Sequence, residues 1–231
     1  MKSLNVTFKV SLFALLLVFM SFDVSAQDNT YRPLPQFLFP SFTEGYVVMK
    51  EGKKFSALLN YNMVDQIMVT ELNGEYRYAT RMEEIDTIYL GLKEFVPADK
   101  FFNEVLVKGT ATFFLQNKSL YTPKGSNVGY GARSQSVGPT DFKRYELTNV
   151  CYQYNEVVHI ELPPNVDVTP AFVYWVRISD EMKKFSNERQ FLKIFPEKES
   201  DLKEYIKKEK INLKVREDII RLGIYCNELI K

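Results

Sequence analysis

Residues 66–80 have the sequence QIMVTELNGEYRYAT, in which Asn73-Gly74 separates two short runs rich in β-branched and aromatic residues. Asn-Gly is the dipeptide most typical of a two-residue β-hairpin turn, because both turn positions require a positive backbone φ. The stretch therefore predicts a hairpin around this dipeptide, with Val69 opposite Tyr78.

The preceding stretch contains a second candidate hairpin, since Tyr46–Lys50 and Lys53–Tyr61 flank Glu51-Gly52. If the turn holds only these two residues, Val48 lies opposite Phe55. Only a short segment separates the two hairpins, so we expect four consecutive strands to form a meander.

Alternation of apolar and polar residues continues the β pattern beyond these hairpins. We therefore expect residues 43–185 to form an antiparallel β domain, preceded by a proline-punctuated, extended lead-in at 27–42. The further predicted strands are Ile85–Leu90, Glu94–Val96, Glu104–Lys108, Thr112–Leu115, Tyr145–Tyr154, Glu156–Leu162 and Ala171–Ile178.

The hydrophobic period changes to about 3.6 residues near Ser186, which is a candidate helix N-cap, as is Ser200. The clearest helix comes last, where apolar side chains recur at helical spacing. Its stripe consists of Val215, Ile219, Leu222, Cys226 and Leu229. We expect 186–231 to form a helical C-terminal subdomain packed on the sheet. The predicted fold class is α+β, with an antiparallel meander-rich sheet or open barrel and C-terminal helices.

Met1–Ala26 has the pattern of a signal peptide, with early lysines, a run at 10–20 that is continuously apolar or small, and the small-residue ending Val24-Ser25-Ala26. The apolar run is near half of the about 20 residues that a spanning helix needs. Residue 27 is Gln rather than a lipidatable Cys. The sequence therefore predicts an exported product, periplasmic or extracellular, with cleavage at about Ala26 and no membrane insertion afterwards.

The charge of the predicted exported product is balanced. Without Lys2, Lys9 and Asp23, the 30 basic and 29 acidic residues become 28 of each. No overall field then favours nucleic acid or an anionic membrane as a partner. The two cysteines, Cys151 and Cys226, permit a disulfide in an exported chain, and two buried thiols are the alternative.

The sequence lacks the motifs of the common catalytic and metal sites. Its single histidine, His159, lies in an apolar predicted strand, and the two-histidine zinc motif is therefore excluded. Acidic groups at 83–86 and 197–201 are typical of a solvated turn and a helix start. We expect no catalytic residues, no metal and no cofactor.

The composition of segment 122–140 is the one that core packing explains least. It holds Gly125, Gly129, Gly131 and Gly138 and does not have the spacing of a phosphate loop. Long loops of this kind are commonly either functional or disordered. If this one binds a ligand, Tyr130 is the aromatic platform, Arg133 the charged clamp and Gln135 a polar contact. Replacing Tyr130 and Arg133 by Ala is then expected to abolish binding without changing the melting temperature.

Four short motifs together resemble a group of uncharacterised exported proteins common in the Bacteroidetes. They are Phe39-Pro40-x-Phe42-x-x-Gly45, Leu59-Asn60-Tyr61-Asn62, Tyr130-Gly131-x-x-Ser134-Gln135 and Phe191-Leu192-Lys193-Ile194-Phe195-Pro196. The resemblance implies an envelope location and carries no catalytic residues.

These observations favour a non-catalytic periplasmic or secreted binding or assembly module whose partner is an envelope protein or a glycan. A different class remains open, namely a glycan- or peptidoglycan-acting hydrolase whose carboxylates meet only in the fold. A third is a structural envelope protein that assembles through its strand edges. Converging carboxylates in a cleft would favour the hydrolase, and a shallow surface without them would favour the module.

Overall fold

The computed structural model describes residues 34–79, 81–123, 127–128, 132–133, 162 and 166–231. The chain divides into two compact units, Met1–Arg32 and Pro33–Lys231, and all described residues belong to the second. The predicted signal peptide and the predicted strands between 145 and 161 lie outside the described residues.

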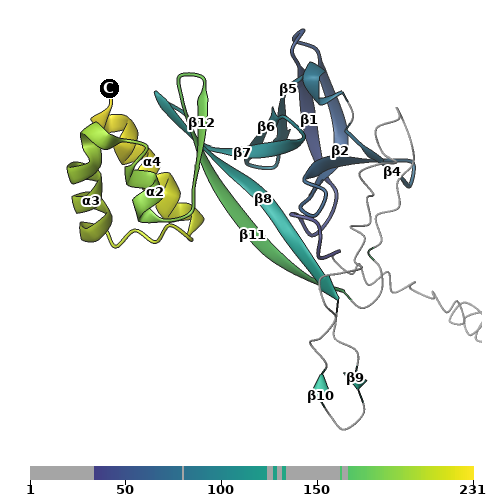
Figure 1. Ribbon diagram of the computed structural model, residues 1–231. Coiled ribbons are helices and arrows are strands. Elements are labelled where there is room, and N and C mark those ends of the chain that lie inside the picture. The colour runs from purple at the N-terminus through teal and green to yellow at the C-terminus, as the bar shows by residue number, and fades with distance from the viewer. Residues whose placement is uncertain (1–33, 80, 124–126, 129–131, 134–161, 163–165) are drawn as a thin grey trace, which may run out of the picture. The chain divides into compact units, whose positions relative to one another are not determined.

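The second unit is built on a ten-stranded sheet in which every neighbouring pair is antiparallel (Figure 1). The strand order is β12-β11-β8-β7-β6-β5-β1-β2-β3-β4, so the sheet has two edges and does not close. This confirms the predicted α+β class. The strands are β1 Thr43–Met49, β2 Lys54–Asn62, β3 Ile67–Leu72, β4 Glu75–Tyr78, β5 Ile85–Leu90, β6 Lys93–Ala98, β7 Phe101–Val107, β8 Ala111–Pro123, β11 Val166–Ile178 and β12 Glu181–Phe185. A separate two-stranded ladder joins β9 Asn127–Val128 to β10 Ala132–Arg133.

The first four strands form the predicted meander, and β5 then returns to pair with the free side of β1. The hairpin register around Asn73-Gly74 is the predicted one, with Val69 opposite Tyr78. Asn73 and Gly74 have φ of 55° and 80°, as the two central positions of this turn require.

The register of the β1–β2 hairpin differs by one residue from the prediction. Phe55 lies opposite Val47 rather than Val48. The loop contains three residues, 50–52, and ends on Gly52 at a φ of 87°. A turn followed by a left-handed glycine adds a bulge residue, which the two-residue turn expected from the sequence does not have. This shift decides which side chains of the hairpin face solvent.

The long strand β11 runs through Pro170, although the sequence predicted a strand only from Ala171. Proline removes a backbone donor and is tolerated where a strand has no partner on that side. Strand β12 pairs with β11 only from Tyr174 onward, so no described strand pairs with β11 on that side at Pro170. Strand β12 itself was not predicted.

The C-terminal segment contains α2 Glu188–Leu192, α3 Glu199–Lys208 and α4 Arg216–Leu229, with a short 3-10 turn at Pro196–Lys198. A further 3-10 turn, Met82–Glu84, lies between β4 and β5. The N-cap of α2 is Asn187, whose side chain accepts from the backbone N–H of Gln190 at 2.9 Å, so the predicted Ser186 cap is wrong. Helix α3 begins one residue before Ser200 and has no side-chain cap.

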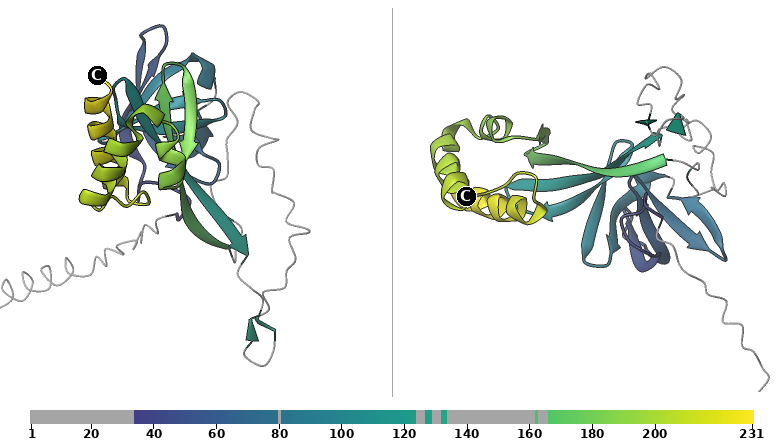
Figure 2. Two further views of the ribbon diagram at one scale, coloured as in Figure 1. Left: turned by 60° about the vertical axis from the view of Figure 1, so that its left-hand side comes forward. Right: turned by 90° about the horizontal axis from the view of Figure 1, so that it is seen from below.

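Two apolar clusters fill the unit. The first joins β8, β11 and β12 to the helices, and α4 packs on β7 and β8 (Figure 2). Ile219, Leu222 and Cys226 of the predicted α4 stripe are buried there. The second cluster lies under β2, β3, β5, β6 and β7 and receives Leu38 and Phe39 from the segment before β1.

None of the helices within the described ranges combines the length and the hydropathy that crossing a bilayer demands.

Candidate functional site

A single row of cross-strand neighbours crosses the sheet from β2 to β12 and passes through both apolar clusters. Its members, in spatial order, are Phe55, Val47, Ile88, Phe95, Glu104, Leu115, Tyr174 and Phe185. Cross-strand neighbours project to the same face of a sheet. Glu104 is therefore the one charged member of an otherwise apolar and aromatic row, and its exposed fraction is 0%.

Glu104 is held by donors from several elements. On Oε1 it accepts from Lys93 Nζ of β6 at 2.6 Å and from Arg216 at the start of α4, through Nε at 3.1 Å and Nη2 at 2.5 Å. Its Oε2 accepts from Asn117 Nδ2 of β8 at 2.9 Å. One carboxylate thus ties β6, β7, β8 and α4 together.

These contacts fix the charge state of Glu104. Burial alone would raise the pKa of its carboxyl, but the hydrogen bonds from Lys93, Asn117 and Arg216 outweigh burial and lower it. A buried carboxylate with a lowered pKa and both oxygens occupied is a poor proton acceptor. No second carboxylate hydrogen-bonds within this group in the described chain. The arrangement is therefore that of a structural clamp rather than of a catalytic acid–base pair.

The opposite face of the sheet carries an exposed aromatic pair. Tyr46 of β1 lies opposite Ser56 of β2 and opposite Tyr89 of β5. The rings of Tyr46 and Tyr89 stack with centroids 4.9 Å apart and an interplanar angle of 25°. Tyr46 nevertheless keeps 42% of its surface exposed. Lys54 Nζ lies 5.9 Å from the centroid of the Tyr46 ring.

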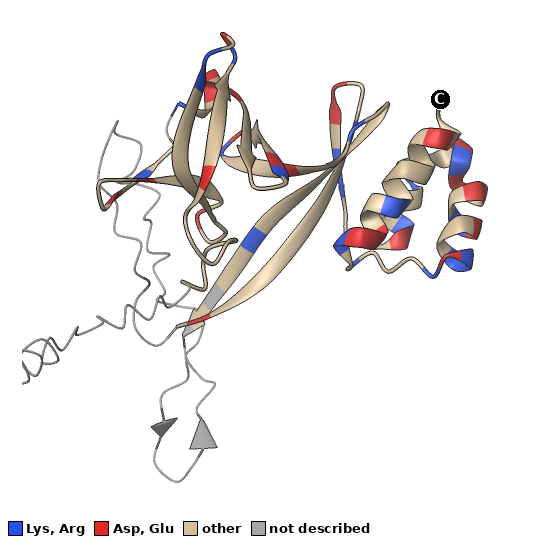
Figure 3. Cartoon of the chain, turned by 180° about the vertical axis from the view of Figure 1, so that it is seen from behind, with Lys and Arg blue, Asp and Glu red and all other residues tan. Residues whose placement is uncertain are grey.

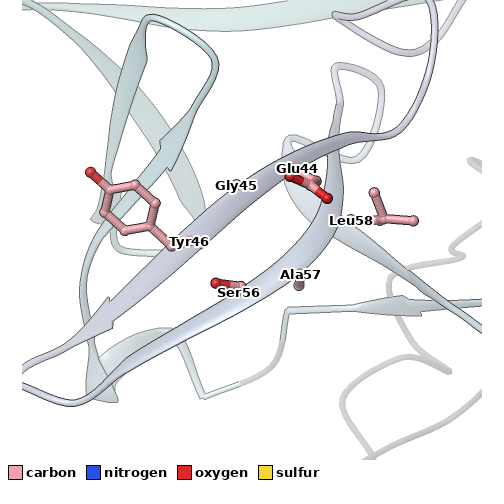
Figure 4. A pocket seen from close by; sticks show the side chains of 6 residues that line it. All are labelled: Glu44, Gly45, Tyr46, Ser56, Ala57 and Leu58. Atoms are coloured by element: carbon pink, nitrogen blue, oxygen red, sulfur yellow. The ribbon is translucent and has the colours of Figure 1, made fainter.

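A hollow of about 600 Å³ lies beside this pair, lined by Glu44, Gly45, Tyr46, Ser56, Ala57 and Leu58. Tyr46 and Leu58 lie at its two ends, with Ser56 and Glu44 between them (Figure 4). The hollow is open, because Glu44, Tyr46, Ser56 and Leu58 are all exposed. We call the surface formed by Glu44, Tyr46, Ser56, Leu58 and Tyr89 the Tyr46 face.

Two lysines near this face form ion pairs with glutamates. Lys53 Nζ lies 3.0 Å from Glu51 Oε1, and Lys108 Nζ lies 2.7 Å from Glu94 Oε1. Figure 3 shows both signs interspersed around the β1–β2 hairpin and along the helices. The face therefore offers aromatic and hydroxyl groups with one lining carboxylate, Glu44, and Glu71 lies on the same side of the sheet as the cross-strand neighbour of Leu58.

The ligand-binding residues predicted from the sequence are mostly beyond the described part of the chain. Tyr130 and Gln135 lie outside it, and the backbone of Arg133 lies in β10 opposite Asn127. The loop site at 122–140 therefore stays a prediction.

Cys226 lies on α4 among apolar side chains, fully buried, and burial raises the pKa of its thiol to about 12. Its predicted disulfide partner, Cys151, lies outside the described residues, so the pairing also stays a prediction. In the described ranges, no three His, Cys, Asp or Glu side chains gather in a way that could hold a metal ion.

Sequence reasoning missed both features described above. Glu104 and Arg216 are 112 positions apart, and no local pattern connects them. The Tyr46–Tyr89 pair depends on β5 returning to the side of β1, which hairpin signals do not predict. The signal available in the sequence was a tyrosine, Tyr46, within a predicted strand.

Comparison of the chain with protein-family models, with curated proteins and with solved structures found no match. A functional assignment therefore depends on the geometry of the sites themselves.

Proposed function

We propose that this protein is a non-catalytic module of the cell envelope, periplasmic or secreted, that binds an envelope component through the Tyr46 face. The observation that carries the proposal is an aromatic ring kept 42% exposed while being fixed by a stack on Tyr89 at 4.9 Å. Tyrosine is a frequent anchor of binding surfaces, because it supplies a large contact area at a low cost in side-chain entropy.

The position of the ring supports recognition rather than packing. Tyr46 lies in the middle of a β-sheet, so its backbone is held by strands on both sides. A site on regular strands keeps its geometry better than a site on a loop. The adjoining hollow of about 600 Å³ lies within the size range of small-ligand sites, about 300–1,000 Å³.

The residues of this face favour binding over hydrolysis. Glycoside hydrolysis uses two carboxyl groups that face each other across the scissile bond. The hollow is lined by one carboxylate, Glu44, while Glu71 and Glu94 share its face of the sheet without lining it. The buried Glu104 lies on the other face with its oxygens occupied. The signal-like pattern of residues 1–26 supports the envelope location.

Co-sedimentation with envelope fragments from the native cell tests the proposal. The purified chain is mixed with increasing amounts of envelope, and the bound fraction is measured. We expect Tyr46→Ala to weaken binding about tenfold, since loss of one aromatic anchor costs on the order of 1.4 kcal/mol or more. Tyr46→Phe is expected to bind like the unaltered chain, because the stacked ring remains.

Phe55→Ala is the matched control. Phe55 is 52% exposed on the same hairpin, but it lies opposite Val47 and therefore on the other face of β2. Binding is expected to survive this change. If the unaltered chain fails to sediment with envelope, or Tyr46→Ala binds as well as Phe55→Ala, the proposal is wrong.

A further inference from the structure

We infer that the ligand of the Tyr46 face is a neutral glycan. This inference rests on the proposed function and adds the chemical class of the ligand. It follows from the ring, from the polar groups beside it and from the charge balance around it.

The Tyr46 ring suits a sugar better than an extended peptide. A pyranose has one face of C–H groups, which can lie flat on an aromatic ring and bury apolar area against it. The stack on Tyr89, at an interplanar angle of 25°, fixes the ring plane before a ligand arrives. Pre-organisation of this kind reduces the entropy lost on binding.

Glu44 and Ser56 supply the polar contacts that a sugar requires. A carboxylate accepts hydrogen bonds through two oxygens, and a hydroxyl both donates and accepts. Both side chains line the hollow next to Tyr46, and both are exposed (Figure 4). Neighbouring hydroxyl groups of one sugar ring can both donate and accept hydrogen bonds.

The charge balance favours a neutral ligand. Lys54 lies 5.9 Å from the Tyr46 ring centroid, Glu44 lines the hollow, and Lys53 and Lys108 are paired with Glu51 and Glu94. An anionic polymer would meet Glu44, and a basic segment would meet Lys54. A neutral, hydroxyl-rich glycan is repelled by neither Glu44 nor Lys54. Lys54 is exposed, so it can leave the ring when a sugar approaches.

Chemical treatment of the envelope fragments distinguishes a glycan from a protein ligand. Periodate cleaves vicinal diols in sugars, and protease digestion removes proteins. We expect periodate to reduce binding of the unaltered chain to the level of Tyr46→Ala, and protease to leave it unchanged. Binding that survives periodate and is lost with protease would overturn the glycan inference, while the proposed function would stand.

Competition with released sugars decides the case in which both treatments abolish binding. Neutral and anionic oligosaccharides released from the same envelope are separated by charge and added to the co-sedimentation assay. We expect the neutral fraction to displace the unaltered chain and Phe55→Ala alike. Absence of competition by the neutral fraction, or competition by the anionic fraction alone, would overturn the inference. Loss of the difference between Tyr46→Ala and Phe55→Ala would instead overturn the proposed function itself.

Discussion

Replacing Glu104 by Gln should reveal how strongly one buried carboxylate holds the sheet to helix α4. The substitution keeps the size of the side chain and removes its negative charge. It turns an acceptor into an N–H₂ donor at a site where Lys93, Asn117 and Arg216 all donate. The positive charges of Lys93 and Arg216 then lie close together without the carboxylate that neutralises them.

The expected loss of unfolding free energy depends on how deeply each of the three charged groups is buried. Removing one partner of a fully buried ion pair costs about 3–5 kcal/mol. The carboxylate is 0% exposed, but the side chains of Lys93 and Arg216 keep 24% and 35% of their surface and can turn toward water. We therefore expect the lower end, about 3 kcal/mol, or roughly 6–12 °C in melting temperature for a unit of this size.

Urea unfolding at several pH values measures this effect and its sign. The folded-state pKa of Glu104 lies below its ordinary value, so ionised Glu104 adds stability above the unfolded pKa. That stability disappears as the pH falls through the folded pKa. The difference in unfolding free energy between the unaltered chain and Glu104→Gln should be largest at neutral pH and should decrease below about pH 4.3.

Glu94→Gln is the matched control, because Glu94 pairs with the largely exposed Lys108. Exposed pairs contribute about 0–1 kcal/mol. If Glu104→Gln loses no more than Glu94→Gln at neutral pH, or if the gap stays constant into acid, the clamp interpretation is refuted.

Asn227 donates to and accepts from the backbone of Ala111 at 2.8 Å each, so Asn227→Ala should cost about 2 kcal/mol by leaving buried polar groups unpaired, as urea unfolding would show. A Cβ at Gly45 would lie 2.6 Å from the Tyr89 carbonyl oxygen, so Gly45→Ala should lower the melting temperature and separate β1 from β5; an unchanged melting temperature would contradict this contact. In the chain reduced beforehand, the buried Cys226 thiol, with its pKa raised to about 12, should resist iodoacetamide at neutral pH when folded and react in concentrated urea, and rapid labelling of the folded protein would contradict its burial.

The sequence predicted well wherever a local pattern determines the structure. Asn73-Gly74 sets its hairpin register, because both residues must adopt positive φ and few other turns accept them. The α4 stripe also appears as predicted, since Ile219 and Leu222 recur at helical spacing and are buried. The antiparallel class follows from such hairpins.

Prediction failed where distant residues decide. The extension of β11 through Pro170 depends on β12 ending before it, and β12 was not itself foreseen. Glu104 looked like an ordinary strand glutamate, because its partners Lys93 and Arg216 come from separate elements. A buried charge is recognisable from sequence only when its counter-charge is local.

The Tyr46 face shows how a small backbone feature creates a site. A two-residue turn at 51–52 would set Tyr46 opposite Ala57, whose side chain packs toward the core. Gly52, at a φ of 87°, adds a residue to the loop and places Tyr46 opposite the exposed Ser56 instead. Adjacent residues of a strand point to opposite faces of the sheet. A one-residue shift in pairing therefore gives each side chain of β1 a different neighbour on β2, one that would otherwise point to the other face. The hydroxyl group beside Tyr46 is therefore a consequence of the hairpin loop, whereas the Tyr46–Tyr89 stack depends on the pairing of β1 with β5. A variant that shortens this loop by one residue should place Ala57 instead of Ser56 beside Tyr46 and should weaken envelope binding even if the ten-stranded sheet survives.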